Sequence, residues 1–192
     1  MTSEFWNERY RQEQTGWDIG TVSTPLQTYF DQLSDRSARI LIPGAGNAYE
    51  AEYLLRKGFT DVTVVDISDE VIGRLAERLQ PLAGNRLTLV CEDFFAHEGR
   101  YDLIVEQTFF CALNPALREA YVRKMKALLK PAGVLAGVLF DRTFAQDGPP
   151  FGGSVAEYDR LFTAEFGSVQ IEPCYNSIPP RAGAEVFILI RP

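Results

Sequence analysis

The sequence predicts an α/β fold built on one mostly parallel, seven-stranded β-sheet with helices on both faces. Short apolar runs bounded by turn residues alternate with helical patterns of about 10–15 residues along most of the chain. Such alternation is typical of successive βαβ units, which build doubly wound parallel sheets. The last two apolar runs, residues 169–172 and 185–190, are separated only by a loop containing Pro and Gly, so we expect those two strands to be antiparallel.

The N-terminal residues 1–24 are polar with spaced aromatic side chains. They predict a short helix at about residues 4–13 and a turn at Gly16-Trp17-Asp18. A second short helix is expected over residues 25–33, where Pro25 suits the first helical turn. We expect residues 1–24 to form an aromatic lid segment on a single domain that spans residues 1–192.

The alternation of strands and helices then begins. The predicted strands are residues 38–42, 62–65, 87–90, 101–105 and 134–140, followed by the final pair. The predicted helices are residues 48–57, 69–79, 115–129 and 154–166. Ser68 and Ser154 stand where helix N-caps belong, and Lys130 to Gly133 is a helix stop signal.

Composition excludes several classes of partner. The 192 residues carry a net charge of −7 without a Lys/Arg cluster, so a nucleic-acid partner is not expected. No apolar run approaches the roughly 20 residues of a membrane span, and the first residues do not resemble a signal peptide. The three cysteines have no CxxC spacing, which favours free thiols in a reducing cytosol. We therefore expect a cytoplasmic monomer with no membrane partner.

A glycine-rich turn follows the first predicted strand. Gly44 and Gly46, in Pro43-Gly44-Ala45-Gly46, let the backbone approach a ligand without an intervening Cβ. The following helix offers free N–H groups to that ligand. A dinucleotide fingerprint would place a third glycine at position 49, where this chain has Tyr49. The turn therefore argues against NAD. It is compatible with an adenosyl ligand that has no pyrophosphate.

Acidic residues follow the next two strands. Asp66, followed by Ile67, comes 22 positions after Gly44, where a carboxylate can accept hydrogen bonds from both ribose hydroxyls. Capping of the next helix is the alternative role for Asp66. Asp93 and Phe94 follow the third strand and could hold an adenine ring, although Phe94 suits core packing equally well.

The fourth predicted strand ends in polar residues at the topological switch point. Glu106, Gln107 and Thr108 should therefore line the reactive end of the cofactor or the second substrate. Glu106 is the one candidate for a general base there. His97, the only histidine, lies in a polar loop, where we expect it to be solvated, and no metal site is expected. Trp6, Tyr10 and Trp17 form either a hydrophobic stripe or a lid over a sulfonium cation.

These residues occur in an order that resembles the thiopurine S-methyltransferase superfamily, and in particular its halide/thiol methyltransferase branch. The similar segments are Trp17-Asp18-Ile19-Gly20, Pro43-Gly44-Ala45-Gly46, Asp66-Ile67-Ser68, Glu92-Asp93-Phe94-Phe95 and Thr108-Phe109-Phe110-Cys111-Ala112. The resemblance covers nearly the whole chain. It implies a Rossmann-like class I methyltransferase that uses S-adenosylmethionine. It also implies cofactor contacts from Trp6, Tyr10, Trp17, Gly44, Asp66, Asp93, Phe94 and Gln107.

A small, soft nucleophile is the methyl acceptor that this pattern favours, namely a thiol, hydrosulfide or halide. Residues 109–113 are apolar, and a dry pocket favours nucleophiles that shed water cheaply. Arg118 could attract an anion, and the remaining candidate contacts are Thr108, Phe110, Tyr175 and Arg181. The alternatives are another small acceptor, such as a thiopurine or chalcogen oxyanion, a non-catalytic S-adenosylmethionine-binding protein, or an NAD-dependent oxidoreductase.

Overall fold

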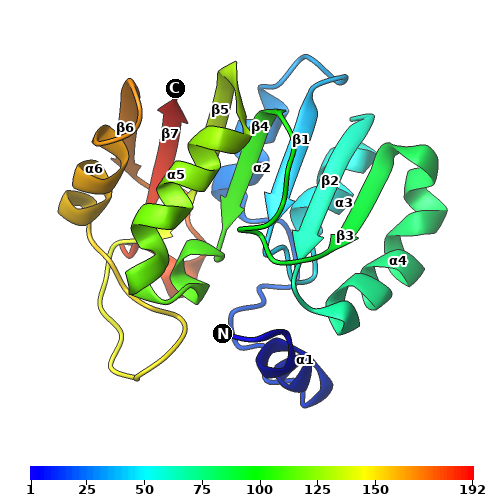
Figure 1. Cartoon of the computed structure of the whole chain (residues 1–192), viewed down its shortest axis with the longest axis horizontal. Helices are drawn as coiled ribbons and strands as arrows, with labels where there is room; N and C mark the ends of the chain where they lie inside the picture. Colours follow the sequence, from blue (N-terminus) through cyan, green and yellow to red (C-terminus); the bar gives the residue numbers. More distant parts are fainter.

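The computed structural model describes residues 1–192, and its seven strands form one sheet in the order β3-β2-β1-β4-β5-β7-β6 (Figure 1). The strands are β1 (Arg39–Pro43), β2 (Asp61–Asp66), β3 (Leu87–Cys91), β4 (Tyr101–Gln107), β5 (Leu129–Phe140), β6 (Ser168–Pro173) and β7 (Glu185–Arg191). Only β7 runs antiparallel to its neighbours, β5 and β6. The predicted fold class and its antiparallel terminal pair are confirmed.

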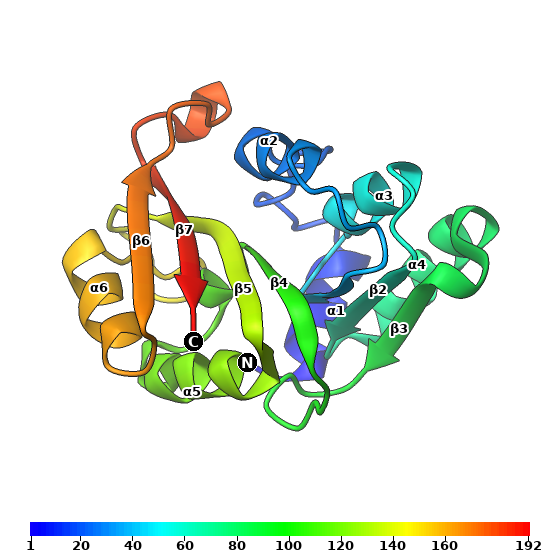
Figure 2. The same ribbon diagram turned by 90° about the horizontal axis from the view of Figure 1, so that it is seen from above.

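Six α-helices flank the sheet. They are α1 (Ser3–Arg11), α2 (Thr24–Asp31), α3 (Tyr49–Arg56), α4 (Asp69–Ala83), α5 (Arg118–Leu128) and α6 (Val155–Thr163). Figure 2 shows α2 and α3 on the face of the sheet opposite α5 and α6. Ser68 caps α4 by accepting a hydrogen bond from the Val71 amide at 3.1 Å, as its sequence position predicted.

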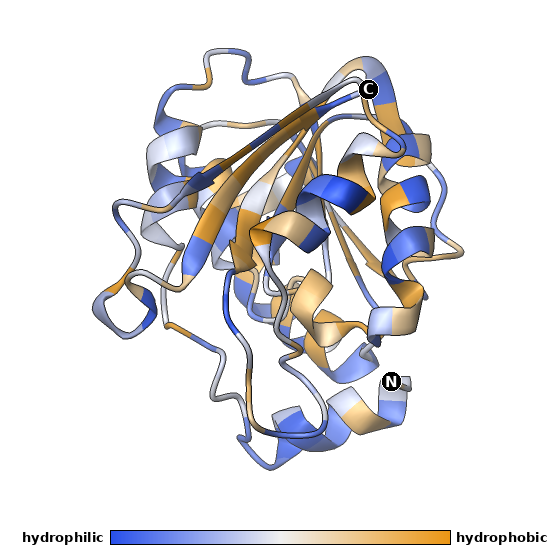
Figure 3. Cartoon of the chain, turned by 90° about the vertical axis from the view of Figure 1, so that its left-hand side faces the viewer, coloured by the Kyte–Doolittle hydropathy of each residue, from blue (hydrophilic) through white to orange (hydrophobic).

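Two apolar cores lie on the two faces of the sheet. Successive residues of β1 alternate between them: Ile40 and Ile42 pack with α2, α3 and α4, whereas Leu41 packs with α5 and α6. Because both faces are covered, the central strands are apolar almost throughout, and Figure 3 shows them as the hydrophobic centre of the molecule. Because the faces of the sheet are buried, a ligand can contact these strands only at their polar ends.

The boundaries around β5 differ from the prediction. The expected helix over residues 115–129 begins with a 3₁₀ turn, Pro115–Leu117, and becomes α-helical only at Arg118. The segment Lys130–Gly133 ends that helix but belongs to β5, where the pairing with β4 shifts register between Tyr101 and Leu103. A bulge accommodates the extra residues, so Pro131 and Gly133 can lie within a strand. Similarly, α4 continues through Pro81 to Ala83, four residues beyond its predicted end, because Leu79 and Ala83 are buried.

His97 is buried, so the expectation of a solvated histidine was wrong. Its Nδ1 lies 2.5 Å from Glu92 Oε1, and its Nε2 lies 2.8 Å from Tyr101 Oη. The His97 ring also stacks on the ring of Tyr101. The loop between β3 and β4 thus satisfies both ring nitrogens internally, which a polar loop sequence does not reveal. None of the helices is long and apolar enough to cross a bilayer.

Candidate functional site

A cavity of about 580 Å³ lies at the carboxyl ends of the central strands and beneath the N-terminal segment. Parallel strands end at the same edge, so the sheet gathers the turns that follow β1, β2, β3 and β4 around this space. The predicted site residues that line it are Trp6, Tyr10, Trp17, Gly44, Gly46, Asp66, Ile67, Asp93, Phe94, Gln107, Thr108 and Arg181. The structure therefore brings most of the predicted site together.

The two glycines of the turn after β1 make room for side chains that pack closely against the backbone. Gly44 has a φ of +57° and Gly46 a φ of +51°. A β-carbon at position 44 would lie 2.0 Å from Cδ2 of Phe109, and one at position 46 would lie 2.7 Å from the hydroxyl of Tyr10. Both glycines are thus required by close neighbours as well as by the backbone conformation.

Asp66 lies at the end of β2 and is only 9% exposed. Its carboxylate accepts hydrogen bonds from the amides of Ser68, at 2.9 Å, and Gly46, at 3.3 Å. Burial raises the pKa of this carboxyl above its ordinary value, an effect that the two amides oppose. The side-chain cap of α4 comes from Ser68, so Asp66 is not needed as its cap and can present its remaining lone pairs to the cavity.

The segment after β3 contributes an acid and an aromatic ring. Asp93 accepts a hydrogen bond from the Phe95 amide at 2.9 Å, which fixes its carboxylate beside the cavity. Phe94 is 5% exposed and packs edge-to-face with Phe109, with ring centroids 5.1 Å apart. Phe94 also lines the cavity, so the two roles proposed for it, core packing and wall, are compatible.

Glu106, at the end of β4, is directed into the protein and not into the cavity. Its Oε1 accepts hydrogen bonds from the amides of Phe109, at 2.8 Å, and Phe110, at 2.9 Å, and its Oε2 accepts one from the Tyr121 hydroxyl. The side chain is completely buried, and desolvation raises its pKa to about 7. The contacts are those of a carboxylate that shapes the turn after β4.

The next two residues form the cavity wall. Oε1 of Gln107 is buried and has no hydrogen-bond partner within the protein. Thr108 has a φ of +59°, a conformation that β-branched residues rarely adopt, and its hydroxyl donates to the carbonyl of Gln107 at 2.7 Å. Unpartnered polar atoms and backbone strain tend to persist where a ligand is bound.

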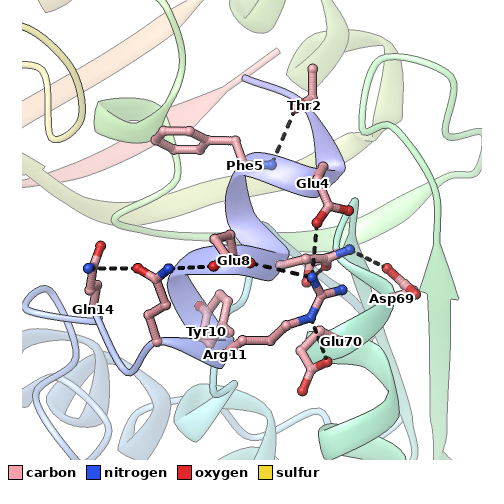
Figure 4. A network of polar contacts seen from close by, with 12 residues as sticks. Thr2, Glu4, Phe5, Glu8, Tyr10, Arg11, Gln14, Asp69 and Glu70 are labelled. Atoms are coloured by element: carbon pink, nitrogen blue, oxygen red, sulfur yellow. Dashed lines mark hydrogen bonds and ion pairs between the residues drawn. The ribbon is translucent and has the colours of Figure 1, made fainter.

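The N-terminal segment is docked on the domain. Trp17 makes edge-to-face contacts with Trp6 and Tyr10, with ring centroids 5.7 and 5.9 Å apart. Asn7 donates to Asp69 and accepts from the Ser68 hydroxyl, both at 2.6 Å. Figure 4 shows the polar network that joins α1 to Asp69 and Glu70 of α4. The aromatic side chains of this segment therefore pack on one another, and α1 is hydrogen-bonded to α4, without a ligand.

Comparison with known proteins shows the family of this chain. A model of the thiopurine S-methyltransferase (TPMT) family matches residues 1–184. The chain belongs to the thiopurine S-methyltransferase family. It is 30% identical to the probable thiol methyltransferase 2 of Arabidopsis thaliana, covering 94% of this chain and 81% of that protein. It is 33% identical to thiocyanate methyltransferase 1 of Brassica oleracea, with the same coverage of 94% and 81%.

Solved structures show the same fold. The Burkholderia thailandensis 1,6-didemethyltoxoflavin-N1-methyltransferase, with bound 1,6-didemethyltoxoflavin and S-adenosylhomocysteine, superimposes with a TM-score of 0.72 and 22% identity, covering 98% of this chain and 85% of that one. A glycopeptide N-methyltransferase in complex with S-adenosylhomocysteine gives a TM-score of 0.74 at 15% identity, covering 91% of each chain. As a family member, this chain is an S-adenosylmethionine-dependent methyltransferase.

Four of the predicted residues do not line the cavity of this methyltransferase: Glu106, Phe110, Arg118 and Tyr175. Arg118 is 5% exposed and is bound to Glu157, at 2.7 Å, and to the carbonyl of Gly152, at 2.6 Å. Its guanidinium packs over the buried Phe110 ring. Tyr175 is 87% exposed. The prediction that these residues contact the ligands directly was therefore wrong. For Arg118, the reason is that the fold brings the Glu157 carboxylate from a distant segment within hydrogen-bond distance.

Sequence reasoning missed several lining residues. Asp18 accepts hydrogen bonds from Asn47 and from the Gly20 amide, joining the N-terminal turn to the β1 turn. Arg9 and Arg142 also line the cavity, from α1 and from the segment after β5. Asp18 could have been found from its place in the Trp17-Asp18-Ile19-Gly20 motif, but isolated arginines give no signal until the fold places them.

Proposed function

We propose that this methyltransferase moves the methyl group of S-adenosylmethionine onto a small, soft nucleophile: a thiol, hydrosulfide or halide. The observation that carries the proposal is the wall of the cavity beyond Thr108, which is mostly apolar, has Asn114, Arg142 and Arg181 as its polar members, and contains no carboxylate or histidine. Its apolar lining residues are Phe109, Cys111, Ala112, Leu113, Leu117, Phe140, Phe144, Pro149, Pro150 and Pro180. A dry wall of this kind favours acceptors with a low cost of desolvation.

The opposite half of the cavity suits the cofactor. Asp66 has free lone pairs for the ribose hydroxyls, and Asp93 with Phe94 can hold the adenine ring. Gly44 and Gly46 line the cavity between these groups, and their missing β-carbons leave room for the Phe109 ring and the Tyr10 hydroxyl, which line it as well. The orphaned Oε1 of Gln107 needs a hydrogen-bond donor, which the ammonium group of the methionine part can supply.

The aromatic cluster suits the charge of the cofactor. Trp6, Tyr10 and Trp17 line the cavity, and Trp17 packs edge-to-face with the other two rings. A sulfonium cation is stabilised by aromatic faces. When bound, S-adenosylmethionine supplies an electrophilic methyl carbon, whose bond to sulfur breaks, with the electron pair staying on sulfur, as the acceptor lone pair bonds to carbon.

No group on the acceptor side is arranged as a general base. Glu106 is held by two amides and the Tyr121 hydroxyl, and His97 is held between Glu92 and Tyr101. Burial raises the pKa of the Cys111 thiol, so that side chain stays protonated and neutral. An acceptor that is already anionic near neutral pH needs no proton removed, so the protein contributes alignment and exclusion of water.

The relatives support this choice of acceptor. Two of the similar plant proteins are a probable thiol methyltransferase and a thiocyanate methyltransferase. A bacterial relative from Nitrosospira multiformis, 26% identical over 84% of this chain and 81% of its own length, is a thiopurine S-methyltransferase. All three names denote sulfur nucleophiles or an anion that carries sulfur, which agrees with a soft acceptor.

The test is a comparison of kcat/KM for iodide, hydrosulfide, a small thiol, a thiopurine, a phenol and an amine, with S-adenosylhomocysteine formation as the readout. We expect turnover to be highest with the sulfur and halide acceptors. Activity confined to the phenol or the amine would overturn the proposed acceptor while leaving the methyltransferase assignment intact. Calorimetry should also show that S-adenosylhomocysteine binds and that NAD does not.

A further inference from the structure

Two arginines in the cavity wall have no acidic partner. Arg9 and Arg142 both line the cavity, and neither forms an ion pair or donates a side-chain hydrogen bond within the protein. The Arg9 Nε–H is buried and has no acceptor. The only partners of the two guanidinium groups are aromatic rings: Phe5 lies 4.6 Å from the Arg9 guanidinium, and Phe144 lies 4.9 Å from that of Arg142.

The other arginines near the cavity are differently used. Arg181 donates to Glu185 at 3.3 Å and to the Trp17 carbonyl at 2.7 Å, so its charge is compensated. Arg118 is paired with Glu157 outside the cavity. Arg9 and Arg142 are therefore the two cationic side chains in the cavity wall whose charge no carboxylate of the protein compensates.

The backbone is held in place at both Arg9 and Arg142. Arg142 forms an isolated β-bridge with Gly153, whose amide donates to the Arg142 carbonyl at 3.0 Å. Arg9 lies on α1, which Asn7 ties to Ser68 and Asp69. Two guanidinium groups with anchored backbones and no internal partner are arranged to receive an external anion.

The overall charge of the chain works against an anionic acceptor, so local positive charge in the cavity would favour its binding. The protein carries a net charge of −7, which repels small anions at long range. The carboxylates that line the cavity, namely Asp18, Glu50, Asp66, Glu92 and Asp93, come from the N-terminal turn and from the segments after β1, β2 and β3. They suit the cationic cofactor and disfavour an anion, so attraction has to come from elsewhere in the wall.

We propose that Arg9 and Arg142 form the anion-recognition site that draws a small anionic acceptor, such as iodide or hydrosulfide, into the cavity. This inference rests on the proposed function, because it assigns the residues that select the charge of the acceptor. Both residues are binding residues; methyl transfer itself still depends on alignment in the apolar wall.

The test compares the wild-type protein with Arg9→Gln, Arg142→Gln and the double variant, with iodide varied at saturating S-adenosylmethionine and S-adenosylmethionine varied at saturating iodide. We expect KM for iodide to rise about tenfold for each single variant and further for the double variant, with kcat nearly unchanged. Arg160→Gln makes the same change of charge at an exposed position of α6 that does not line the cavity, and it should leave KM unchanged.

Anion binding can also be measured without turnover. Trp6 and Trp17 are the only tryptophans and both line the cavity, so iodide bound there should quench their fluorescence. With S-adenosylhomocysteine bound, we expect a saturable component of iodide quenching in the wild type that is lost in the double variant. Acrylamide, an uncharged quencher, should act equally on both proteins.

Three outcomes would overturn the inference: an unchanged KM for iodide, a saturable quenching component that survives in the double variant, or a raised KM for S-adenosylmethionine alone. The last would show that the arginines hold the carboxylate of the cofactor. If the wild type methylates no thiol or halide, the proposed function fails, but the quenching experiment still tests the anion site by itself.

Discussion

The ring of Phe109 covers Gly44 so closely that a β-carbon at position 44 would lie 2.0 Å from its Cδ2 atom. This relationship joins the turn after β1 to the turn after β4, the two central strands of the sheet. Phe109 in turn is positioned by Glu106, which accepts a hydrogen bond from its amide. The cofactor side and the acceptor side of the cavity therefore share one packing contact.

Replacing Gly44 with alanine should destabilise the protein by about 2 kcal/mol or more, because the methyl group collides with Phe109 and the φ of +57° becomes strained. Affinity for S-adenosylhomocysteine should fall as well. Gly58→Ala is the matched control, since Gly58 has a φ of +89° but open space around it. Urea unfolding and calorimetry on both variants measure the two effects. Equal losses in the two variants would contradict a role for the Phe109 contact.

Asp66→Ala should weaken binding of S-adenosylhomocysteine by on the order of 10–100-fold, because one charge-assisted hydrogen bond contributes about 1.5–3 kcal/mol. Some stability is also expected to be lost, since the carboxylate accepts the amides of Gly46 and Ser68. Ser154→Ala, which removes the side-chain cap of α6 away from the cavity, provides a control of comparable destabilisation. Calorimetric affinities that are the same in the two variants would make Asp66 purely structural.

Stability should fall with rising pH because of Glu106. Burial raises the pKa of this carboxyl to about 7 from its ordinary value of 4.5, so the folded protein holds a proton that the unfolded chain releases between these values. The folded state is therefore penalised increasingly as pH rises from about 4.5 to 7, by up to about 3 kcal/mol, and not further above pH 7.

Glu106→Gln removes that titration. Relative to the wild type, the variant should therefore become more stable as the pH rises from 5 to 8. Denaturant unfolding at several pH values measures this difference in unfolding free energy. Asp66 and Glu50, whose pKa values are also raised by burial, are common to both proteins and cancel. The variant should keep kcat within about tenfold of the wild type. A loss of about a hundredfold or more would instead identify Glu106 as a general base.

Asn7→Ala should loosen α1, because it removes two hydrogen bonds of 2.6 Å to Ser68 and Asp69 at the start of α4. We expect faster hydrogen exchange in residues 3–20, with protection partly restored by S-adenosylhomocysteine. Gln12→Ala, which removes only exposed contacts with Glu8 and Gln14 within the N-terminal segment, is the control. Exchange that is unchanged in the Asn7 variant would show that the aromatic contacts alone hold the segment.

The sequence by itself determined the sheet, its antiparallel end and most of the residues that the strand ends gather around the cavity. These follow from local signals: apolar strands that end in Gly44 or Asp66, and helices that begin at residues such as Ser68. Because the carboxyl ends of parallel strands meet at one edge, residues far apart in the chain could be placed together without a structure.

Only the tertiary structure decided which of the candidate acceptor contacts line the cavity. Glu106 and Arg118 have the residue types expected of a base and an anion receptor, yet each is bound inside the protein, to Tyr121 and to Glu157. Arg9 and Arg142 carry no motif, yet they are the arginines left without an acidic partner in the cavity wall. The role of a polar side chain depends on which partner the fold places within hydrogen-bond distance, and those partners lie 15 to 39 positions away in the sequence.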